Sequence, residues 1–167
     1  TIRTINSVVV QLLYNTTALD STDMLHRVTL TTIARGTATD IAGGPGARHT
    51  GTATSTYVYC VARDGASDEL EFGHTVAGVR TADGTVAATV ADGDVVEIRA
   101  IGDQLSCKHN GVTVLGPITE NTGSGNVNIM LRFSGSGTAT TTTVIMDNSR
   151  AELASDAAFG RLRRRAM

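Results

Sequence analysis

The sequence has no tryptophan, two prolines and an aromatic content of only 4% in 167 residues. A hydrophobic core must therefore come from valine, isoleucine, leucine and alanine, and a hydrophobic content of 41% is enough for one domain of this length. Threonine is abundant, and there are 18 glycines. Because β-branched residues favour strands and glycine favours turns, this composition predicts short strands joined by tight turns.

An excess of charge of either sign is also missing. The formal net charge is −2, and Lys108 is the only lysine. A chain with this charge has no general attraction for nucleic acid or a membrane surface, so we expect neither as a partner. No apolar run approaches the ~20 residues of a transmembrane helix. The first residues, T-I-R-T-I-N, lack the charged and apolar regions of a signal peptide, so we expect a protein made without secretion.

Motifs for common chemistry are absent as well. The chain has no phosphate-binding glycine loop, and no serine or cysteine stands in a recognisable nucleophile context. Its four histidines are scattered, and there is no C-x-x-C pair, so a zinc site is not favoured. The sequence therefore predicts a protein that is not an enzyme.

The two cysteines, Cys60 and Cys107, fall on predicted strands at positions that point inward. We interpret them as buried thiols that act as small apolar side chains, in line with the missing secretion signal. A disulfide between them remains open, because it requires their strands to be neighbours.

The clearest pattern in the chain is a three-stranded meander over residues 92–116. Apolar Val96, Ile98 and Ala100 alternate with polar side chains, as on a strand with one buried face. Gly102-Asp103 and Asn110-Gly111 supply the turns, and the second pair suits a two-residue hairpin of type I′.

The remaining sequence predicts further strands at spacings of roughly 8–12 residues, about ten in all, which is typical of an all-β sandwich. The expected strands outside the meander are 8–13, 24–33, 56–63, 69–76, 127–133 and 140–149. A further pair of strands, 79–81 and 86–90, is expected around a turn at Ala82-Asp83-Gly84. Residues 35–55 are rich in glycine, alanine and threonine without periodicity, and predict a long exposed loop with at most an edge strand. From Ala151 the composition suits a short helix, so we divide the chain into a sandwich over 1–153 and an arginine-rich tail over 154–167.

Four of these segments together resemble a known family. They are T-Y-V-Y-C-V-A-R at 56–63, D-G-D-V-V-E-I-R-A-I-G at 92–102, L-S-C-K-H-N-G-V-T-V at 105–114 and V-I-M-D-N at 144–148. Their order resembles the concanavalin A-like, or laminin G-like, jelly roll, above all in the versions found in virion proteins of tailed bacteriophages. The likeness covers residues 20–153. Ser149 stands where the family usually has an aromatic residue, and the Asp-x-Phe segment and tryptophan that usually open the domain are absent, so we expect a front that is shortened or completed by a neighbouring chain.

The resemblance implies an antiparallel two-sheet jelly-roll sandwich and a non-enzymatic role in a phage particle, as a minor tail, fibre or head-decoration protein. It also implies partners: other virion subunits, further copies of the same chain, and a glycan of the host surface. The loops 35–55 and 134–143 would make these contacts. The expected location is the virion, assembled in the host cytoplasm. The alternative is a carbohydrate-binding, lectin-like module, followed by a glycoside hydrolase.

Some members of the superfamily are glycosidases with the motif E-x-D-x-x-E, which residues 68–72 match only in part. Glu69 and Glu71 would share one face of a strand, but the middle aspartate and final glutamate are missing, so we expect a solvated face. Lectin-like jelly rolls often bind calcium through loop oxygens, and Asp64 and Asp68 are the candidate ligands here. Asp-Gly turns are also explained by backbone geometry alone. No other cofactor is expected.

Two further groups of residues are candidate binding sites. Tyr57, Tyr59 and Arg63 point to one side of their strand, and with Glu97 and Arg99 they would stack on a sugar or pack on a protein partner. Packing beneath a neighbouring loop is the alternative for the tyrosines. The cluster in the tail is either a solvated end or an anchor for an acidic groove of another subunit; it comprises Arg161, Arg163, Arg164 and Arg165.

Overall fold

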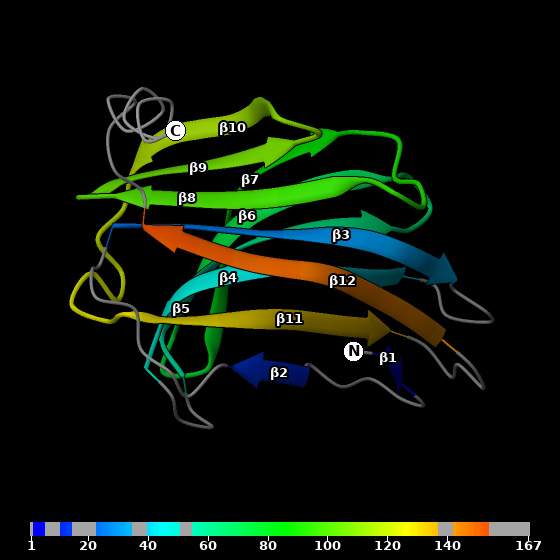
Figure 1. The fold of residues 1–167 in the computed structure, drawn as a ribbon, viewed down its shortest axis with the longest axis horizontal. Helices are drawn as coiled ribbons and strands as arrows, with labels where there is room; N and C mark the ends of the chain where they lie inside the picture. The colour runs from blue at the N-terminus through cyan, green and yellow to red at the C-terminus, as the bar shows by residue number, and fades with distance from the viewer. Residues whose placement is uncertain are drawn as a thin grey trace, which may run out of the picture.

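The computed structural model of the chain describes residues 2–5, 11–14, 23–34, 40–50, 55–136 and 142–153. They form two six-stranded antiparallel sheets stacked face to face (Figure 1). This confirms the predicted all-β jelly-roll sandwich. No helix that could cross a membrane occurs in these residues. The arginine-rich tail over 154–167 lies outside them.

Each sheet brings together strands from distant parts of the chain. In order across sheet A lie β1 (Ile2–Ile5), β12 (Thr142–Leu153), β3 (Met24–Ala34), β8 (Val95–Ile101), β9 (Gln104–His109) and β10 (Val112–Thr119). In order across sheet B lie β2 (Gln11–Tyr14), β11 (Asn128–Ser136), β4 (Asp40–His49), β5 (Tyr57–Asp64), β6 (Glu69–Val76) and β7 (Val79–Ala87). The strands β7 and β10 therefore form edges of the two sheets on the same side of the sandwich (Figure 1).

The predicted meander is confirmed as β8, β9 and β10. Its second turn has Asn110 at φ 50° and Gly111 at φ 83°, the positive values that a type I′ hairpin requires. The inward residues of β8 and β9 enter the core between the sheets, where they meet the inward residues of β3, β5, β6 and β11. This core is built from aliphatic side chains and only two phenylalanines, Phe72 and Phe133, as the composition predicts.

The cysteines form a disulfide rather than two free thiols. Cys60 on β5 and Cys107 on β9 have Cα atoms 5.7 Å apart, although their strands belong to different sheets. The interpretation of buried thiols was wrong because it considered only neighbours within one sheet. Facing sheets of a sandwich are usually about 10 Å apart, but β5 and β9 approach closely enough at this position for the two cysteines to bond. The bond links the sheets directly across the core.

Within residues 35–55, the described residues 40–49 are not part of the predicted exposed loop. Within this range β4 is a central strand of sheet B, between β11 and β5, and residues 41–49 are all buried. Its glycines explain both facts, because small residues let the neighbouring strands approach closely. A Cβ atom on Gly44 would overlap the carbonyl oxygen of Cys60, and one on Gly46 would lie 2.8 Å from Met130 Cγ. The strand lacks alternation because both of its faces are packed.

The predicted turn at Ala82-Asp83-Gly84 is also wrong. These residues lie inside β7, which runs without interruption from Val79 to Ala87. The chain reverses instead at Ala77 and Gly78, both with positive φ. The pairing of β6 with β7 shifts register between Phe72 and Gly73, which is a β-bulge at the level of Asp83.

A histidine occupies the core beside these close-packed strands. His26 on β3 is fully buried, and its Nδ1 donates a hydrogen bond to the carbonyl oxygen of Gly46 at 2.9 Å. Burial lowers the pKa of His26 from 6.5 to about 4, and the hydrogen bond to Gly46 offsets only part of that effect. The imidazole is therefore neutral in the folded protein at neutral pH.

This burial predicts a pH dependence of stability. The pKa of His26 is lower in the folded than in the unfolded chain, so the unfolded chain binds more protons. Lowering the pH therefore stabilises the unfolded state relative to the folded state. We expect the free energy of unfolding to fall by about 2–3 kcal/mol from about pH 7.5 to about pH 4.5. The measurement is urea unfolding across this range. The His26→Gln variant should lose most of the slope, and an equally steep slope in that variant would contradict the prediction.

Candidate functional site

The face of sheet B that points away from the core carries a second buried cluster. Along β5, Val58, Cys60 and Ala62 enter the core between the sheets, whereas the alternate residues point to the other side. Those alternate residues pack with partners from β4 and β11, and the cluster comprises Ala42, Tyr57, Tyr59, Val61 and Met130. The outer face of sheet B is therefore not a simple solvated surface.

Beside this cluster, a buried carboxylate binds two arginines and a tyrosine. Glu71 on β6 accepts a hydrogen bond from the Tyr59 hydroxyl at 2.7 Å through Oε1, and one from Arg63 Nη1 at 2.7 Å through Oε2. Arg80 of β7 reaches the same carboxylate with two nitrogens: Nε lies 3.0 Å from Oε1, and Nη2 contacts Oε2. Arg63 also pairs with Glu69 at 3.2 Å. We call these five residues the Glu71 network.

Strand pairing places each member of the network. Arg63 is opposite Glu69 and Val61 is opposite Glu71 across β5 and β6, so the charged side chains emerge on one face. Gly73, opposite Tyr59, leaves room for the tyrosine, because a Cβ atom there would lie 2.5 Å from the hydroxyl oxygen. Arg80 is opposite Thr75, which lies on the same face of β6 as Glu71, so its long side chain extends over this face to the carboxylate.

The network holds Glu71 ionised. Burial alone would raise the pKa of Glu71, but hydrogen bonds from Tyr59 and Arg80 and the charges of Arg80 and Arg63 outweigh it, so the pKa lies below its ordinary value. The pKa of Tyr59 is raised by burial and by the negative charge of Glu71. Glu69 and Glu71 share one face, as predicted. An ionised carboxylate cannot serve as a general acid, but it can serve as a nucleophile or base. Both oxygens of Glu71 accept hydrogen bonds from the network, so this carboxylate holds Arg63, Arg80 and Tyr59 in position.

Solvent reaches the network at its charged ends. Side-chain exposure is 1% for Glu71 but 26% for Arg63, 29% for Glu69 and 42% for Arg80. A guanidinium has five N–H donors in a rigid plane, so these arginines retain donors after pairing with Glu71. Glu69 adds acceptor oxygens beside them. The accessible part of the network is thus a fixed group of donors and acceptors on the outer face of sheet B.

A third arginine packs against the same tyrosine. The guanidinium of Arg132 on β11 lies 4.5 Å from the centre of the Tyr59 ring, a cation–π contact, and Arg132 is 4% exposed. Tyr57 lies beside Tyr59, with ring centres 6.0 Å apart. Both tyrosines are nearly fully buried, at 3% and 0% exposure, so neither ring offers an open face for stacking on a sugar. Their burial matches the alternative interpretation, in which they pack within the protein.

The structure divides the predicted binding residues between two faces. Tyr57, Tyr59 and Arg63 lie on the outer face of sheet B. Glu97 and Arg99 alternate with core residues of β8 and therefore lie on the outer face of sheet A, on the other side of the sandwich. Glu97 there pairs with Lys108 at 3.6 Å. The two groups do not form one site.

The predicted calcium ligands do not gather further carboxylates. Asp68 accepts a hydrogen bond from the Val90 amide at 3.4 Å and lines a shallow depression near the β5–β6 turn. In the residues whose side chains are described, Asp64 and Asp68 are not part of a group of three or more ligating side chains. Calcium at Asp64 and Asp68 stays a prediction.

Sequence reasoning missed Arg80 and Arg132. Arg132 alternates with the apolar Leu131 and Phe133, which was a signal that it faces outward from sheet B. Arg80 gave no such signal, because its strand was divided by the wrongly predicted turn. Its contact with Glu71 depends on the pairing of β6 with β7, whose register no pattern in the sequence revealed.

Comparisons with known proteins establish the fold. No family model and no curated protein matches the sequence. Among solved structures, the carbohydrate-binding module CBM66 from Bacillus subtilis superposes with a TM-score of 0.63 at 13% identity, over 89% of this chain and 85% of that one. Sheep galectin-11 in complex with glycerol gives 0.55 at 8% identity, over 89% and 99%. The CBM2 module of the evolved Dit of Lactobacillus casei BL23 phage J-1 gives 0.53 at 15% identity, over 86% and 67%.

The Glu71 network predicts a large difference between two neighbouring glutamates. Glu71→Gln should lower the free energy of unfolding by about 1.5–3 kcal/mol, because the amide nitrogen would face arginine donors in a buried position. Glu69→Gln is the matched control, since Glu69 also pairs with Arg63 but is more exposed, and should cost under ~1 kcal/mol. Urea unfolding near neutral pH measures both. Equal effects of the two substitutions would contradict the account.

Proposed function

We propose that the chain is a non-enzymatic carbohydrate-binding module that receives its glycan on the outer face of sheet B. The observation that carries this proposal is the buried Glu71 carboxylate with two arginines anchored to it and partly open to solvent. Arg63, Glu69 and Arg80 are the residues that would contact the sugar, and Glu71 and Tyr59 would hold them in position.

Sugar hydroxyls both donate and accept hydrogen bonds, so a glycan site needs both kinds of group at fixed positions. Arg63 and Arg80 supply donors, and Glu69 supplies acceptors. Because Glu71 holds both guanidinium groups in place, little side-chain entropy is lost when a ligand binds. Partial burial also strengthens charge-assisted hydrogen bonds relative to those on an open surface.

The comparisons support this class of function without specifying a ligand. The structures that share the fold include a carbohydrate-binding module, a galectin and a carbohydrate recognition domain. The hydrogen bonds that both Glu71 oxygens accept support a positioning role for this carboxylate. The fold is also compatible with the family resemblance, since the concanavalin A-like jelly roll is a common scaffold for sugar recognition.

The test is a binding screen of the purified chain against neutral, uronate-containing and amino-sugar oligosaccharides, and against purified bacterial cell-wall polysaccharide. We expect one class to bind, and Arg63→Lys or Arg80→Lys to weaken it at least tenfold, because lysine lacks the planar fork. Arg27→Lys is the matched control. Arg27 lies on the outer face of sheet A, opposite Glu97, and its replacement should leave binding unchanged.

Two results would contradict the proposal. One is the absence of binding to every class of glycan by the folded wild-type chain. The other is weakened binding in Arg99→Lys with normal binding in Arg80→Lys, which would move the site to sheet A.

A role in a phage particle is the second candidate, and one comparison favours it. The module from phage J-1 Dit covers 86% of this chain, and a glycan-binding module on a virion would combine both proposed roles. The disulfide between Cys60 and Cys107 fits this setting, because disulfides persist on virion and cell surfaces and are rare in reducing compartments. Head or tail subunits and further copies of the chain would then be its partners.

Co-sedimentation of the chain with purified phage tails and capsids tests the virion role. We expect the chain to attach to the particles at a fixed stoichiometry. The Arg80→Lys variant should attach equally well, because the assembly contacts would be separate from the glycan site. A soluble chain that ignores particles but binds a glycan would exclude the virion role and leave the carbohydrate-binding proposal standing.

A further inference from the structure

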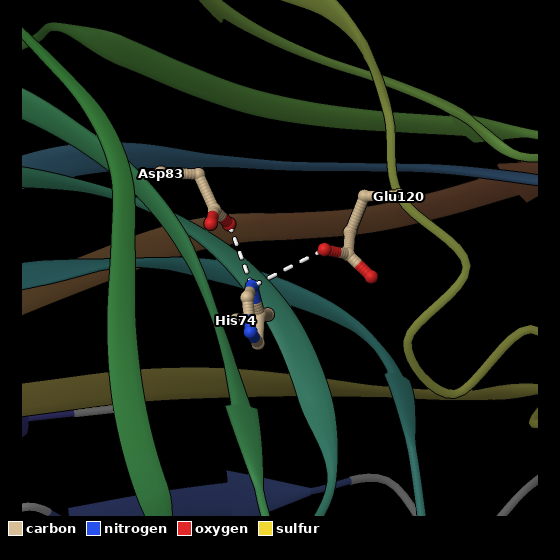
Figure 2. A group of neighbouring side chains, drawn as sticks. All are labelled: His74, Asp83 and Glu120. Carbon is tan, nitrogen blue, oxygen red and sulfur yellow. Dashed lines mark hydrogen bonds and ion pairs between the residues drawn. The ribbon is translucent and has the colours of Figure 1, made fainter.

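A histidine and two carboxylates meet at the side of the sandwich where β7 and β10 form the sheet edges. His74 Nδ1 lies 2.8 Å from Asp83 Oδ2 and 3.3 Å from Glu120 Oε2 (Figure 2). The three ligating atoms all lie within 4.8 Å of one another. Figure 2 shows the two carboxylates approaching the same imidazole nitrogen from two sides. This group lies apart from the Glu71 network, because His74 is opposite Val58, which faces the core.

We infer that His74, Asp83 and Glu120 form a binding site for one divalent transition-metal ion of the zinc or manganese class. A single Nδ1 hydrogen cannot satisfy two carboxylates well, whereas a cation placed between the three atoms interacts with all of them. In a tetrahedral site with bonds of about 2.1 Å, ligand atoms lie about 3.4 Å apart. The observed separations of 2.8 and 3.3 Å are close to that geometry. An imidazole ligand favours zinc over calcium or magnesium, and the two carboxylates also suit manganese.

The three ligands are held by independent features of the fold. His74 is fixed on β6, and Asp83 is the extra residue of the β-bulge where β6 pairs with β7, two residues from Thr81, which is opposite His74. Glu120 follows β10. Its amide donates to the Asp103 carbonyl at 2.8 Å, and its Oε1 accepts a hydrogen bond from the Thr122 amide at 2.7 Å. Such supporting hydrogen bonds orient metal ligands and maintain their geometry.

The two carboxylates of Asp83 and Glu120 bring negative charge to the site, which suits a cation. Side-chain exposures of 18%, 16% and 18% for the three ligands leave a path from solvent. Three protein ligands leave a further coordination position open for water. The ion would tie β6 and β7 of sheet B to the segment after β10 of sheet A, and so close the sandwich between its sheet edges.

The test uses the full chain after treatment with EDTA. Isothermal titration with Zn²⁺ or Mn²⁺ should show one equivalent bound, and Ca²⁺ should bind at least tenfold more weakly. At an ion concentration about 100 times Kd, the melting temperature should rise by at least about 5 °C. His74→Asn retains a polar group near the position of Nδ1 but is a poor ligand, and should weaken binding at least tenfold. Asp83→Asn and Glu120→Gln should act likewise.

His109→Asn is the matched control. His109 Nε2 pairs with Asp94 at 2.9 Å at a similar exposure, but only one carboxylate is present there. This variant should bind the ion as tightly as the wild type. Circular dichroism establishes whether each variant is folded. If a variant with a substitution in a strand fails to fold, the affinity of Glu120→Gln for the ion decides the test, because Glu120 lies outside the strands.

Three outcomes would overturn the inference. They are no uptake of Zn²⁺ or Mn²⁺ by the EDTA-treated wild type, unchanged affinity in the folded ligand variants, and equal loss in His109→Asn. The first would leave His74 and the two carboxylates as a group of side chains in contact with one another and no ion. Because none of these variants touches Arg63 or Arg80, the result is independent of glycan binding.

Discussion

The burial of the Glu71 carboxylate is the constraint on which the outer face of sheet B depends. A carboxylate that is 1% exposed is tolerated only with charged and hydrogen-bonding partners around it. Arg63, Arg80 and Tyr59 supply these partners, and their positions follow from the register of β5, β6 and β7. The same interactions that satisfy the buried charge fix two guanidinium groups at the surface, which is what a preorganised binding site requires.

The close packing behind this face depends on small residues. Gly44 and Gly46 allow β4 to lie close to β5 and β11, and Gly73 leaves space for the Tyr59 hydroxyl. On the core-facing side of sheet B, the disulfide between Cys60 and Cys107 links the two sheets. Sheet B is therefore packed on both faces across its central strands. We expect this rigid part of sheet B to recognise a ligand through polar groups held at fixed positions rather than through mobile loops.

The sequence predicted the fold class and most strands, because alternation and turn residues are local signals. The hairpin at Asn110-Gly111 and the strand Glu69–Val76 are confirmed. Central strand β4 was missed because its glycines and alanines pack on both faces and leave no alternation. The turn at Ala82-Asp83-Gly84 was wrong because strong turn residues also occur at bulges. The disulfide depended on contact between sheets, which no local pattern reveals.

The candidate sites were less predictable than the fold. Arg63 and Tyr59 were identified from alternation alone, but their grouping with Glu97 and Arg99 required knowing which strands share a sheet. The contact of Arg80 with Glu71, and the convergence of His74 with Asp83 and Glu120, arise from the register of β6 with β7 and from contacts between distant segments. Sites assembled by tertiary structure are not visible as motifs, even when each strand that carries them is correctly predicted.

The measurement that tests the central claim most directly is an amide NMR titration of the chain with an oligosaccharide found to bind in the screen. The account predicts that the largest chemical-shift changes fall on β5, β6 and β7, at Arg63, Glu69 and Arg80 and the residues beside them, while β8 and β9 remain unchanged. Shift changes confined to β8 and β9, or spread evenly over both sheets, would contradict a binding site on the outer face of sheet B.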